Sequence, residues 1–184
     1  MILDPRLLEE VGDLVFSGFW FLGEKHNMEQ DLLIRKGELK DLDILVEFNQ
    51  ALIYETEKKE LPVNVITGGV ETLLKTPSLG FYLLAEKNNQ VVGSLMITTE
   101  WSDWRNGLYW WIQSVYVHQN FRRQGIFKTL YQFVKKQAEN QDNGLKVCGF
   151  RLYVEHENTV AQKTYQALGM KESHYHIYEE LRNQ

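Results

Sequence analysis

The sequence predicts an α+β fold, and three observations support this prediction. Apolar residues recur at helical spacing in several segments and alternate with polar residues in others. Two extended segments are separated only by Asn88-Asn89, which is typical of a β-hairpin. From Tyr109 onward the pattern runs strand, helix, strand, helix. This order predicts helices packed against a sheet that contains antiparallel pairs.

The composition is that of a soluble domain. The chain has 184 residues, of which 43% are hydrophobic and 24% are charged, so it is long enough for one domain with a substantial core. The formal net charge of −5 argues against nucleic-acid binding, because phosphate polymers are bound by basic surfaces. The single Cys148 cannot form an internal disulfide, which fits a reducing compartment. We therefore expect a cytoplasmic protein.

The first 30 residues differ from the rest of the chain. They combine acidic side chains with the aromatic residues Phe16, Phe19, Trp20 and Phe21. We expect residues 1–30 to form a helical extension that packs on the domain or on a second subunit, because an exposed aromatic cluster promotes association. The longest apolar run, Leu14 to Leu22, is too short to span a membrane, and acidic residues precede it. The domain itself is expected to cover residues 31–184.

The first half of the domain predicts a strand and two helices. Leu32–Lys36 is a short strand, and Asp41–Lys58 carries apolar residues near helical spacing, which predicts an amphipathic helix. Pro62 breaks this helix from the next segment. Gly68-Gly69 predicts a loop, so the second helix is confined to Val70–Lys75.

The middle of the chain predicts three strands. Phe81–Lys87 and Val91–Thr99 flank the hairpin signal, and Tyr109–Val117 follows after a loop from Glu100 to Gly107. Five aromatic residues gather around this loop and the strand after it. They are Trp101, Trp104, Tyr109, Trp110 and Trp111. Because alternate residues of a strand face opposite sides, some belong to the core and others are available to contact a cation.

The last part of the chain alternates helices and strands. Gly125–Glu139 has apolar residues at helical spacing, and Phe150–Val154 has them at every second position. Thr159–Leu168 predicts a helix that stops at Gly169. Tyr175–Glu180 predicts a final strand.

A basic turn joins the strand that ends at Val117 to the helix that begins near Gly125. The first turn of a helix has backbone N–H groups without internal partners, so it can bind a phosphate. Glycine lets the backbone approach an oxyanion closely, and Arg122, Arg123 and Lys128 add positive charge. A turn without any ligand explains these residues equally well on this segment alone.

Two motifs in the right order resemble one family. Val115-x-Val117 followed by Arg122-Arg123-Gln124-Gly125-Ile126 resembles the acyl-CoA motif Q/R-x-x-G-x-G/A of the GCN5-related N-acetyltransferases, the GNAT superfamily. Phe127 departs from this motif, because the family usually has Gly or Ala there. The segment from Asn158 through Ala161 and Tyr165 to Gly169 is similar to a later family motif, in which an Asn precedes a helix that carries a Tyr. An N-cap and a core residue are the structural alternatives for Asn158 and Tyr165.

The resemblance covers roughly residues 31 to 180 and implies a layered α/β/α fold with a mixed, mostly antiparallel central sheet. It also implies that the strand ending at Val117 and the strand Phe150–Val154 splay apart to receive the arm of acetyl-CoA. No metal is expected, because His174-x-His176 lacks a third ligand at suitable spacing. The residues that the resemblance assigns to acetyl-CoA are Val115, Tyr116, Val117, Arg122, Arg123, Gln124, Gly125, Ile126, Phe127, Lys128 and Asn158.

The resemblance implies direct attack of an amine on the thioester, with Tyr165 as the general acid. The stretch Tyr109–Ser114 has no carboxylate where several family members place a base, so we expect proton removal through water to Glu100, with Asp103 as an alternative. Tyr54 and Glu55 resemble the Tyr-Glu pair of polyamine acetyltransferases on the acceptor side. Trp111 and Gln113 are further candidates for acceptor contacts.

Together these features predict an N-acetyltransferase that acts on a primary amine of a small polyamine-like, amino-acid-like or aminoglycoside-like molecule. A peptide or protein amine is an alternative acceptor. A non-catalytic acyl-CoA-binding module is a further alternative, and a nucleotide-phosphate module is disfavoured by the short glycine loop. No nucleic acid or membrane partner is expected, and a homodimer is compatible with the family.

Overall fold

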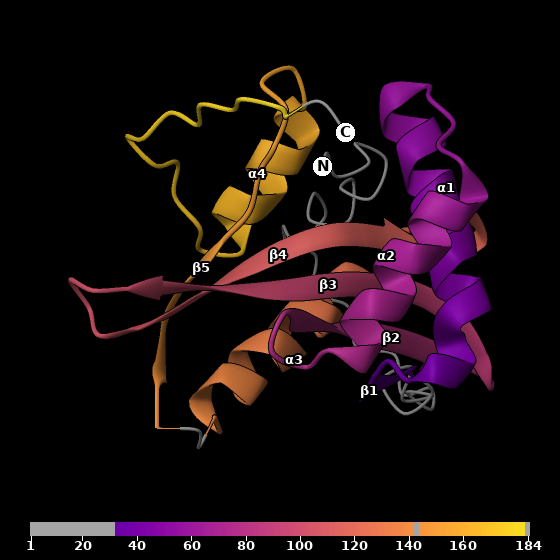
Figure 1. Ribbon diagram of the computed structural model, residues 1–184, viewed down its shortest axis with the longest axis horizontal. Helices are drawn as coiled ribbons and strands as arrows, with labels where there is room; N and C mark the ends of the chain where they lie inside the picture. The colour runs from indigo at the N-terminus through magenta and orange to yellow at the C-terminus, as the bar shows by residue number, and fades with distance from the viewer. Residues whose placement is uncertain (1–31, 142–143, 183–184) are drawn as a thin grey trace, which may run out of the picture.

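A five-stranded sheet in the order β1-β2-β3-β4-β5 forms the centre of the computed structural model, which describes residues 32–141 and 144–182 (Figure 1). Neighbouring strands from β1 to β4 are antiparallel, and β5 runs parallel to β4. The predicted mixed, mostly antiparallel sheet is therefore confirmed. The predictions for residues 1–30 lie outside the described residues. The strands are β1 (Leu32–Lys36), β2 (Gly80–Lys87), β3 (Gln90–Ser102), β4 (Gly107–Val117) and β5 (Lys146–Arg151).

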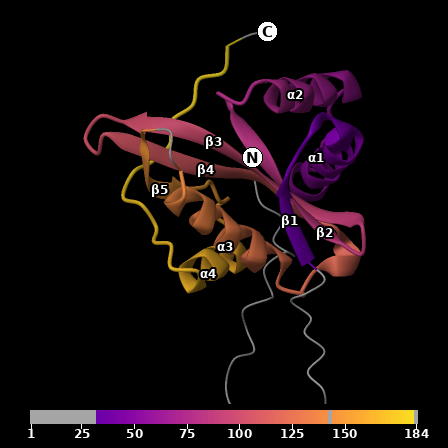
Figure 2. The same ribbon diagram turned by 90° about the horizontal axis from the view of Figure 1, so that it is seen from below.

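Helices cover both faces of this sheet (Figure 2). Helices α1 (Leu42–Glu57) and α2 (Val63–Lys75) pack on one face. Helices α3 (Ile126–Glu139) and α4 (Thr159–Ala167) pack on the other. Two short 3-10 turns, η4 (Leu39–Asp41) and η5 (Gln119–Phe121), precede α1 and α3. The expected α/β/α layering is confirmed.

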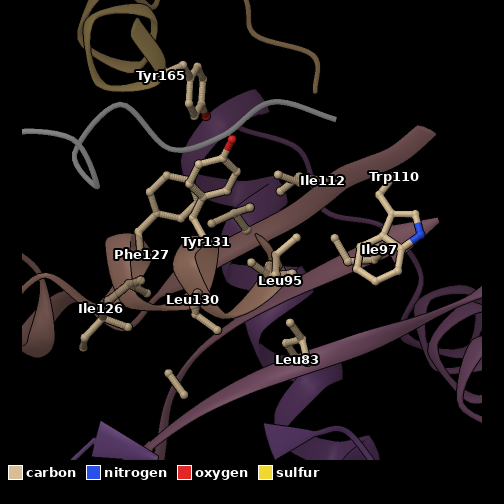
Figure 3. Packing of buried hydrophobic residues seen from close by; sticks show 14 of the residues in the cluster. Leu83, Leu95, Ile97, Trp110, Ile112, Ile126, Phe127, Leu130, Tyr131 and Tyr165 are labelled. Carbon is tan, nitrogen blue, oxygen red and sulfur yellow. The ribbon is translucent and has the colours of Figure 1, made fainter. Parts of the chain in front are cut away.

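Alternation along the strands divides the core between the two faces. In β2, Leu83 faces α3 and α4, whereas Tyr82 and Leu84 face α1 and α2. The larger cluster lies under α3, where Leu130 packs against Leu83 and the other buried strand residues (Figure 3).

An ion pair fixes the entry into α1. Arg35 in β1 donates from Nη1 and Nη2 to the two carboxylate oxygens of Asp41, each at 2.8 Å. The backbone N–H of Glu38 also donates to Asp41, at 2.8 Å. The bonds from Arg35 are the main cause that lowers the pKa of Asp41 below its ordinary value.

Helix α2 is longer than predicted. It begins at Val63, directly after Pro62, and the predicted loop at Gly68-Gly69 lies inside it. Backbone N–H groups at the start of a helix have no intrahelical acceptor, so the missing N–H of Pro62 costs no hydrogen bond and proline is compatible with the start of α2. Each glycine costs about 1 kcal/mol relative to alanine, and burial of the helix face that includes Ile66 and Val70 offsets this cost.

Two predicted strands differ in the structure. The strand predicted at Phe150–Val154 is β5, which begins at Lys146 and ends at Arg151. The segment Tyr175–Glu180 is not a strand. Its alternating pattern satisfies the local requirement for a strand, but Tyr175, Ile177 and Tyr178 are exposed and no pairing with a neighbouring strand is formed within the described residues.

The sheet opens between β4 and β5. Their pairing runs from Gly107 opposite Lys146 to Trp111 opposite Arg151, and it does not continue along the described chain. A bulge lies just beyond this point, because the register of β3 with β4 shifts around Ser114, which has a φ of 46°. A bulge bends and twists its strand, so the second half of β4 turns away from β5. The splay that the resemblance implies is therefore present.

Candidate active site

The turn between β4 and α3 presents open backbone donors. Arg123 and Gly125 have left-handed φ values of 63° and 75°, and Gly125 is the N-cap of α3. No side chain caps this end of the helix. A Cβ atom at Gly125 would meet nothing within 4 Å, so the space in front of the turn is open. This arrangement suits an anion, because the helix dipole and the unpartnered N–H groups both favour negative charge.

Phe127 does not obstruct this turn, although it departs from the family motif. Its side chain is 3% exposed and lies in the core under the sheet. Its ring stacks on Tyr131 of α3 at 6.4 Å and meets the ring of Tyr165 edge-on at 6.2 Å. Ile126 is buried as well. Both residues therefore offer only their backbone N–H groups to a ligand at the turn.

Lys87 adds a positive charge to the turn that the sequence did not indicate. It ends β2, and its Nζ donates to Oε1 of Gln124 at 3.0 Å across a separation of 37 residues. Gln124 in turn donates to the backbone oxygen of Asn120 at 3.3 Å. The exposed Lys128 follows in the first turn of α3. Only the pairing of distant strands could bring Lys87 here, so no local motif reveals it.

Arg122 and Glu55, which the sequence assigned to different substrates, bind each other. Nη2 of Arg122 donates to Oε2 of Glu55 at 2.8 Å, and their side chains are 8% and 16% exposed. Nε of Arg122 donates to the backbone oxygen of Val117 at 2.9 Å. The guanidinium also lies over the ring of Tyr116, 5.7 Å from its centre. Arg122 thus connects the end of α1 to the turn and to the end of β4.

Beyond Trp111, the outer edge of β4 pairs with no other strand among the described residues, and the backbone oxygen of Val117 on this edge accepts the hydrogen bond from Arg122. The N–H of His118 donates to Val92 in β3 at 2.8 Å, so the backbone groups of Val117 and Val115 point to the opposite edge, because directions alternate along a strand. This edge faces the gap beside β5. The side chains of Val115, Tyr116 and Val117 are buried.

Asn158 and Tyr165 lie on α4 as the motif predicted. Asn158 is the N-cap, and its side-chain oxygen accepts a hydrogen bond from the N–H of Ala161 at 3.0 Å. Ala161 and Tyr165 are buried on the same face of the helix. Asn158 also lines a cavity of ≈ 280 Å³ between the start of α4 and the end of α1, together with Glu55, Thr56, Glu155, Glu157, Thr159 and Val160.

The hydroxyl of Tyr165 is buried without a hydrogen-bond partner in the described part of the chain. The residue is 4% exposed, and its hydroxyl end points from α4 toward α3, where Phe127 and Tyr131 lie (Figure 3). Burial raises the pKa of this phenol well above its ordinary value. The phenol is therefore protonated at physiological pH, and its O–H can donate a hydrogen bond to a bound ligand.

The residues predicted to contact the amine substrate lie on the face of the sheet that carries α1 and α2. Met96 packs against these helices, and Gln113 lies opposite it in the ladder of β3 and β4. Trp111 and Glu100 follow at every second position along β4 and β3, so they lie on the same face. Nε2 of Gln113 donates to Oγ1 of Thr98 at 2.7 Å. Tyr54, at the end of α1, is exposed, with Nζ of Lys58 5.7 Å from its ring centre.

Glu100 is held by two donors. Its Oε2 accepts a hydrogen bond from Nε1 of Trp111 at 2.6 Å. Nη1 of Arg151 bonds to both of its oxygens, at 2.7 and 2.9 Å. Trp111 also stacks on Tyr153, with ring centres 4.5 Å apart. Arg151 and Tyr153 alternate with core residues in the sequence, a pattern that places them on this face, although it does not indicate their contacts.

Residues 32–141 and 144–182 contain neither a candidate metal site nor a candidate membrane-spanning helix. No group of three or more His, Cys, Asp or Glu side chains is placed to hold a metal ion. None of the helices in these ranges has the length and apolar character needed to cross a bilayer.

Comparison with known proteins identifies the family. The model of the Acetyltransferase (GNAT) family matches residues 50–170, which is more than half of the chain. A possible acetyltransferase from Clostridium difficile 630 is 43% identical, and its crystal structure matches with a TM-score of 0.77 over 84% of this chain and 99% of that chain. No curated protein matches the chain.

Two less similar structures share the fold. A predicted acetyltransferase with acetyl-CoA from Clostridium acetobutylicum is 17% identical, with a TM-score of 0.65 over 81% of this chain and 96% of that chain. AAC(6')-Iy in complex with the bisubstrate analogue CoA-S-monomethyl-acetylneamine is 19% identical, with a TM-score of 0.66 over 83% of this chain and 99% of that chain. The family match, the uncapped turn before α3 and the parted strands β4 and β5 agree, and the chain belongs to the GNAT family of acetyltransferases.

Proposed function

We propose that this protein is an acetyl-CoA-dependent N-acetyltransferase that acetylates a primary amine of a small molecule. The uncapped N-terminus of α3, which follows the left-handed residues Arg123 and Gly125, carries the proposal. Its backbone N–H groups fit the diphosphate of CoA, and Lys87 and Lys128 lie beside it. Neighbouring structures that contain acetyl-CoA or a CoA conjugate support the same donor.

The outer edge of β4 would hold the pantetheine arm. The backbone groups of Val115 and the N–H of Val117 face the gap beside β5, and an extended ligand there forms hydrogen bonds like an added strand, while the oxygen of Val117 is bonded to Arg122. The side chains of Val115, Tyr116 and Val117 are buried, so the backbone provides this binding. Asn158 lies at the start of α4 on the cavity that adjoins Glu55.

The reaction joins the amine nitrogen to the acetyl carbon while the carbon–sulfur bond breaks. The thioester supplies the acetyl group, the amine gives up a proton, and the sulfur gains one, so the products are an N-acetylated amine and the CoA thiol. Deprotonating an alkylamine with a pKa of about 10.4 costs about 4.6 kcal/mol at pH 7. The acceptor side must therefore remove a proton as well as bind the amine.

Tyr165 is the proposed proton donor to the sulfur. Its raised pKa keeps the phenol protonated, and its hydroxyl forms no hydrogen bond to the described residues. Glu100 was expected to accept the amine proton through water, but both of its oxygens accept hydrogen bonds from Trp111 or Arg151. Glu155 and Glu157, which line the cavity beside Asn158, offer a second route for this proton.

The test combines a binding measurement with a turnover measurement. Calorimetry with acetyl-CoA should show binding, and ATP should not bind. Thiol release should then appear with a small amine from a panel of polyamines, amino acids and aminoglycosides. Turnover with peptides alone would favour a peptide acceptor, and binding without any turnover would favour a non-catalytic acyl-CoA module.

A matched pair of glycine variants locates the donor site. Gly125→Val should weaken acetyl-CoA binding, because the side chain is strained at a φ of 75° and occupies the space in front of the turn. Gly144→Val is the control, because Gly144 also has a left-handed φ, 81°, with nothing within 4 Å of an added Cβ. Equal affinity of the two variants would contradict a diphosphate site at the turn.

A further inference from the structure

Arg151 occupies a special position on the acceptor side of the sheet. It is the last residue of β5 and pairs with Trp111, beyond which β4 and β5 separate. Its side chain lies on the face of Glu100 and Trp111, opposite the face covered by α3 and α4. The β3–β4 hairpin extends past α1 and α2 (Figure 1). Arg151 therefore lies where β4 and β5 separate, with its side chain partly exposed to solvent.

The guanidinium of Arg151 contacts Glu100 through Nη1 and the ring of Tyr109 through its planar face. Nη1 binds the carboxylate of Glu100, and the centre of the guanidinium lies 3.7 Å from the ring centre of Tyr109. Tyr109 is fixed in turn by Gly149, where an added Cβ would come within 2.6 Å of the ring. Such contacts fix the side chain before any ligand arrives, which lowers the entropy cost of binding.

The other edge of the guanidinium is available. Nε and Nη2 of Arg151 donate to no group among the described residues, and the side chain is 34% exposed. Nε–H and one N–H of Nη2 form the planar fork that matches the two oxygens of a carboxylate. A second guanidinium, that of Arg105, lies 5.4 Å from the ring centre of Tyr109.

The two carboxylates of this region each accept hydrogen bonds from protein donors, although the side chain of Glu100 is 42% exposed. Glu100 accepts hydrogen bonds from Arg151 and Trp111, and Asp103 accepts one from the backbone N–H of Trp104 at 2.8 Å. The side-on fork of Arg151 is therefore the pair of donors in this region that has no protein acceptor among the described residues.

We propose that Arg151 binds the carboxylate of the acceptor, so that the acceptor is an amino acid or another amine that carries a carboxylate. The inference rests on the proposed function and selects one of its acceptor classes. A polyamine or an aminoglycoside carries several positive charges and no anion, so it leaves the fork of Arg151 without a carboxylate partner. Glu100 is a positioning residue, because it orients Arg151 and does not contact the acceptor.

The experiment measures turnover of matched acceptor pairs by thiol release at saturating acetyl-CoA. Each pair consists of an amino acid and the amine that lacks its carboxylate, such as phenylalanine with phenethylamine and lysine with cadaverine. We expect the carboxylate to raise kcat/KM by about 10- to 100-fold, the range for a hydrogen bond to a charged group. The effect should lie mainly in KM, because the carboxylate does not take part in the bond change.

Variants connect this preference to Arg151. Arg151→Gln should abolish the preference within each pair, because the carboxylate of the amino acid then has no guanidinium partner. Arg151→Lys should keep only part of it, because a lysine has the charge but not the fork. Lys146→Gln is the matched control: it removes one positive charge from the other end of β5, where the side chain is exposed. The control should retain the full preference.

The outcomes separate this inference from the proposed function. Absence of acetyl-CoA binding, or acetyl-CoA binding without turnover of any amine in the wider panel, would refute the proposed function. Turnover of aminoglycosides or polyamines without turnover of either amino acid would refute the inference about Arg151 and leave the proposed function standing. Turnover of the amines at least as fast as of the amino acids would refute the inference about Arg151 alone. A preference that survives in folded Arg151→Gln, as judged by its melting temperature and acetyl-CoA affinity, would also refute it.

Discussion

Replacement of Tyr165 by phenylalanine should change stability and catalysis in opposite directions. The hydroxyl is buried with no partner among the described residues, and such a group costs about 1–3 kcal/mol. Removing it should raise the free energy of unfolding of the ligand-free protein by about 1 kcal/mol, or about 2–4 °C in melting temperature for a chain of this size. Turnover should fall by about 100- to 10,000-fold if the phenol protonates the leaving sulfur.

Thermal unfolding with and without acetyl-CoA measures the first effect, and thiol release measures the second. The gain in melting temperature should shrink when acetyl-CoA is bound, because the wild-type hydroxyl then has an acceptor that the variant lacks. Tyr131→Phe is the control, because it removes a hydroxyl from the neighbouring helix and should retain turnover. Unchanged turnover together with a lower melting temperature in Tyr165→Phe would refute the reasoning about this hydroxyl.

Two further predictions concern stability. Gly68→Ala should stabilise the protein by about 0.5–1 kcal/mol in urea unfolding, because the position is helical and an added Cβ meets nothing within 4 Å; a loss of stability would contradict the helical assignment. The pair of Arg35 and Asp41 should stabilise the protein above the ordinary pKa of aspartate, about 3.8, because Arg35 lowers the pKa of Asp41 in the folded state. This contribution declines as the pH falls below that value toward the lowered pKa of the folded state, so Asp41→Asn should destabilise the protein by about 1–3 kcal/mol at pH 7 and by less at pH 3. An equal loss at both pH values would contradict the ion pair.

Local patterns predicted the parts of the fold that local physics determines. The hairpin signal at Asn88-Asn89 identified β2 and β3, and the spacing of apolar residues identified α1, α3 and α4. Asn158 has the N-cap role that its residue type favours. Gly68-Gly69 misled the prediction, because glycine lowers helix propensity locally and only the tertiary burial of Ile66 and Val70 shows that the helix persists.

The site was predictable where one segment carries it and not where distant segments meet. The turn before α3 and Tyr165 follow from continuous motifs. Lys87 reaches the turn through the pairing of β2 in the sheet, which no motif encodes. The ion pair between Glu100 and Arg151 joins residues that are 51 positions apart in the sequence. The sequence named Glu100 as a candidate proton acceptor, but no local pattern indicated that Arg151 would be its partner.

The pair of Arg122 and Glu55 affects how substitutions at either residue should be understood. One residue belongs to the donor motif and the other to the acceptor side, yet they form one part-buried ion pair that also engages Val117. Loss of either charge removes this contact between the end of α1 and the turn before α3. A simultaneous rise in the KM values of both substrates would then indicate loss of the ion pair between Arg122 and Glu55. Exchanging the two charged residues, or replacing both, would separate the structural role of the pair from direct ligand contact.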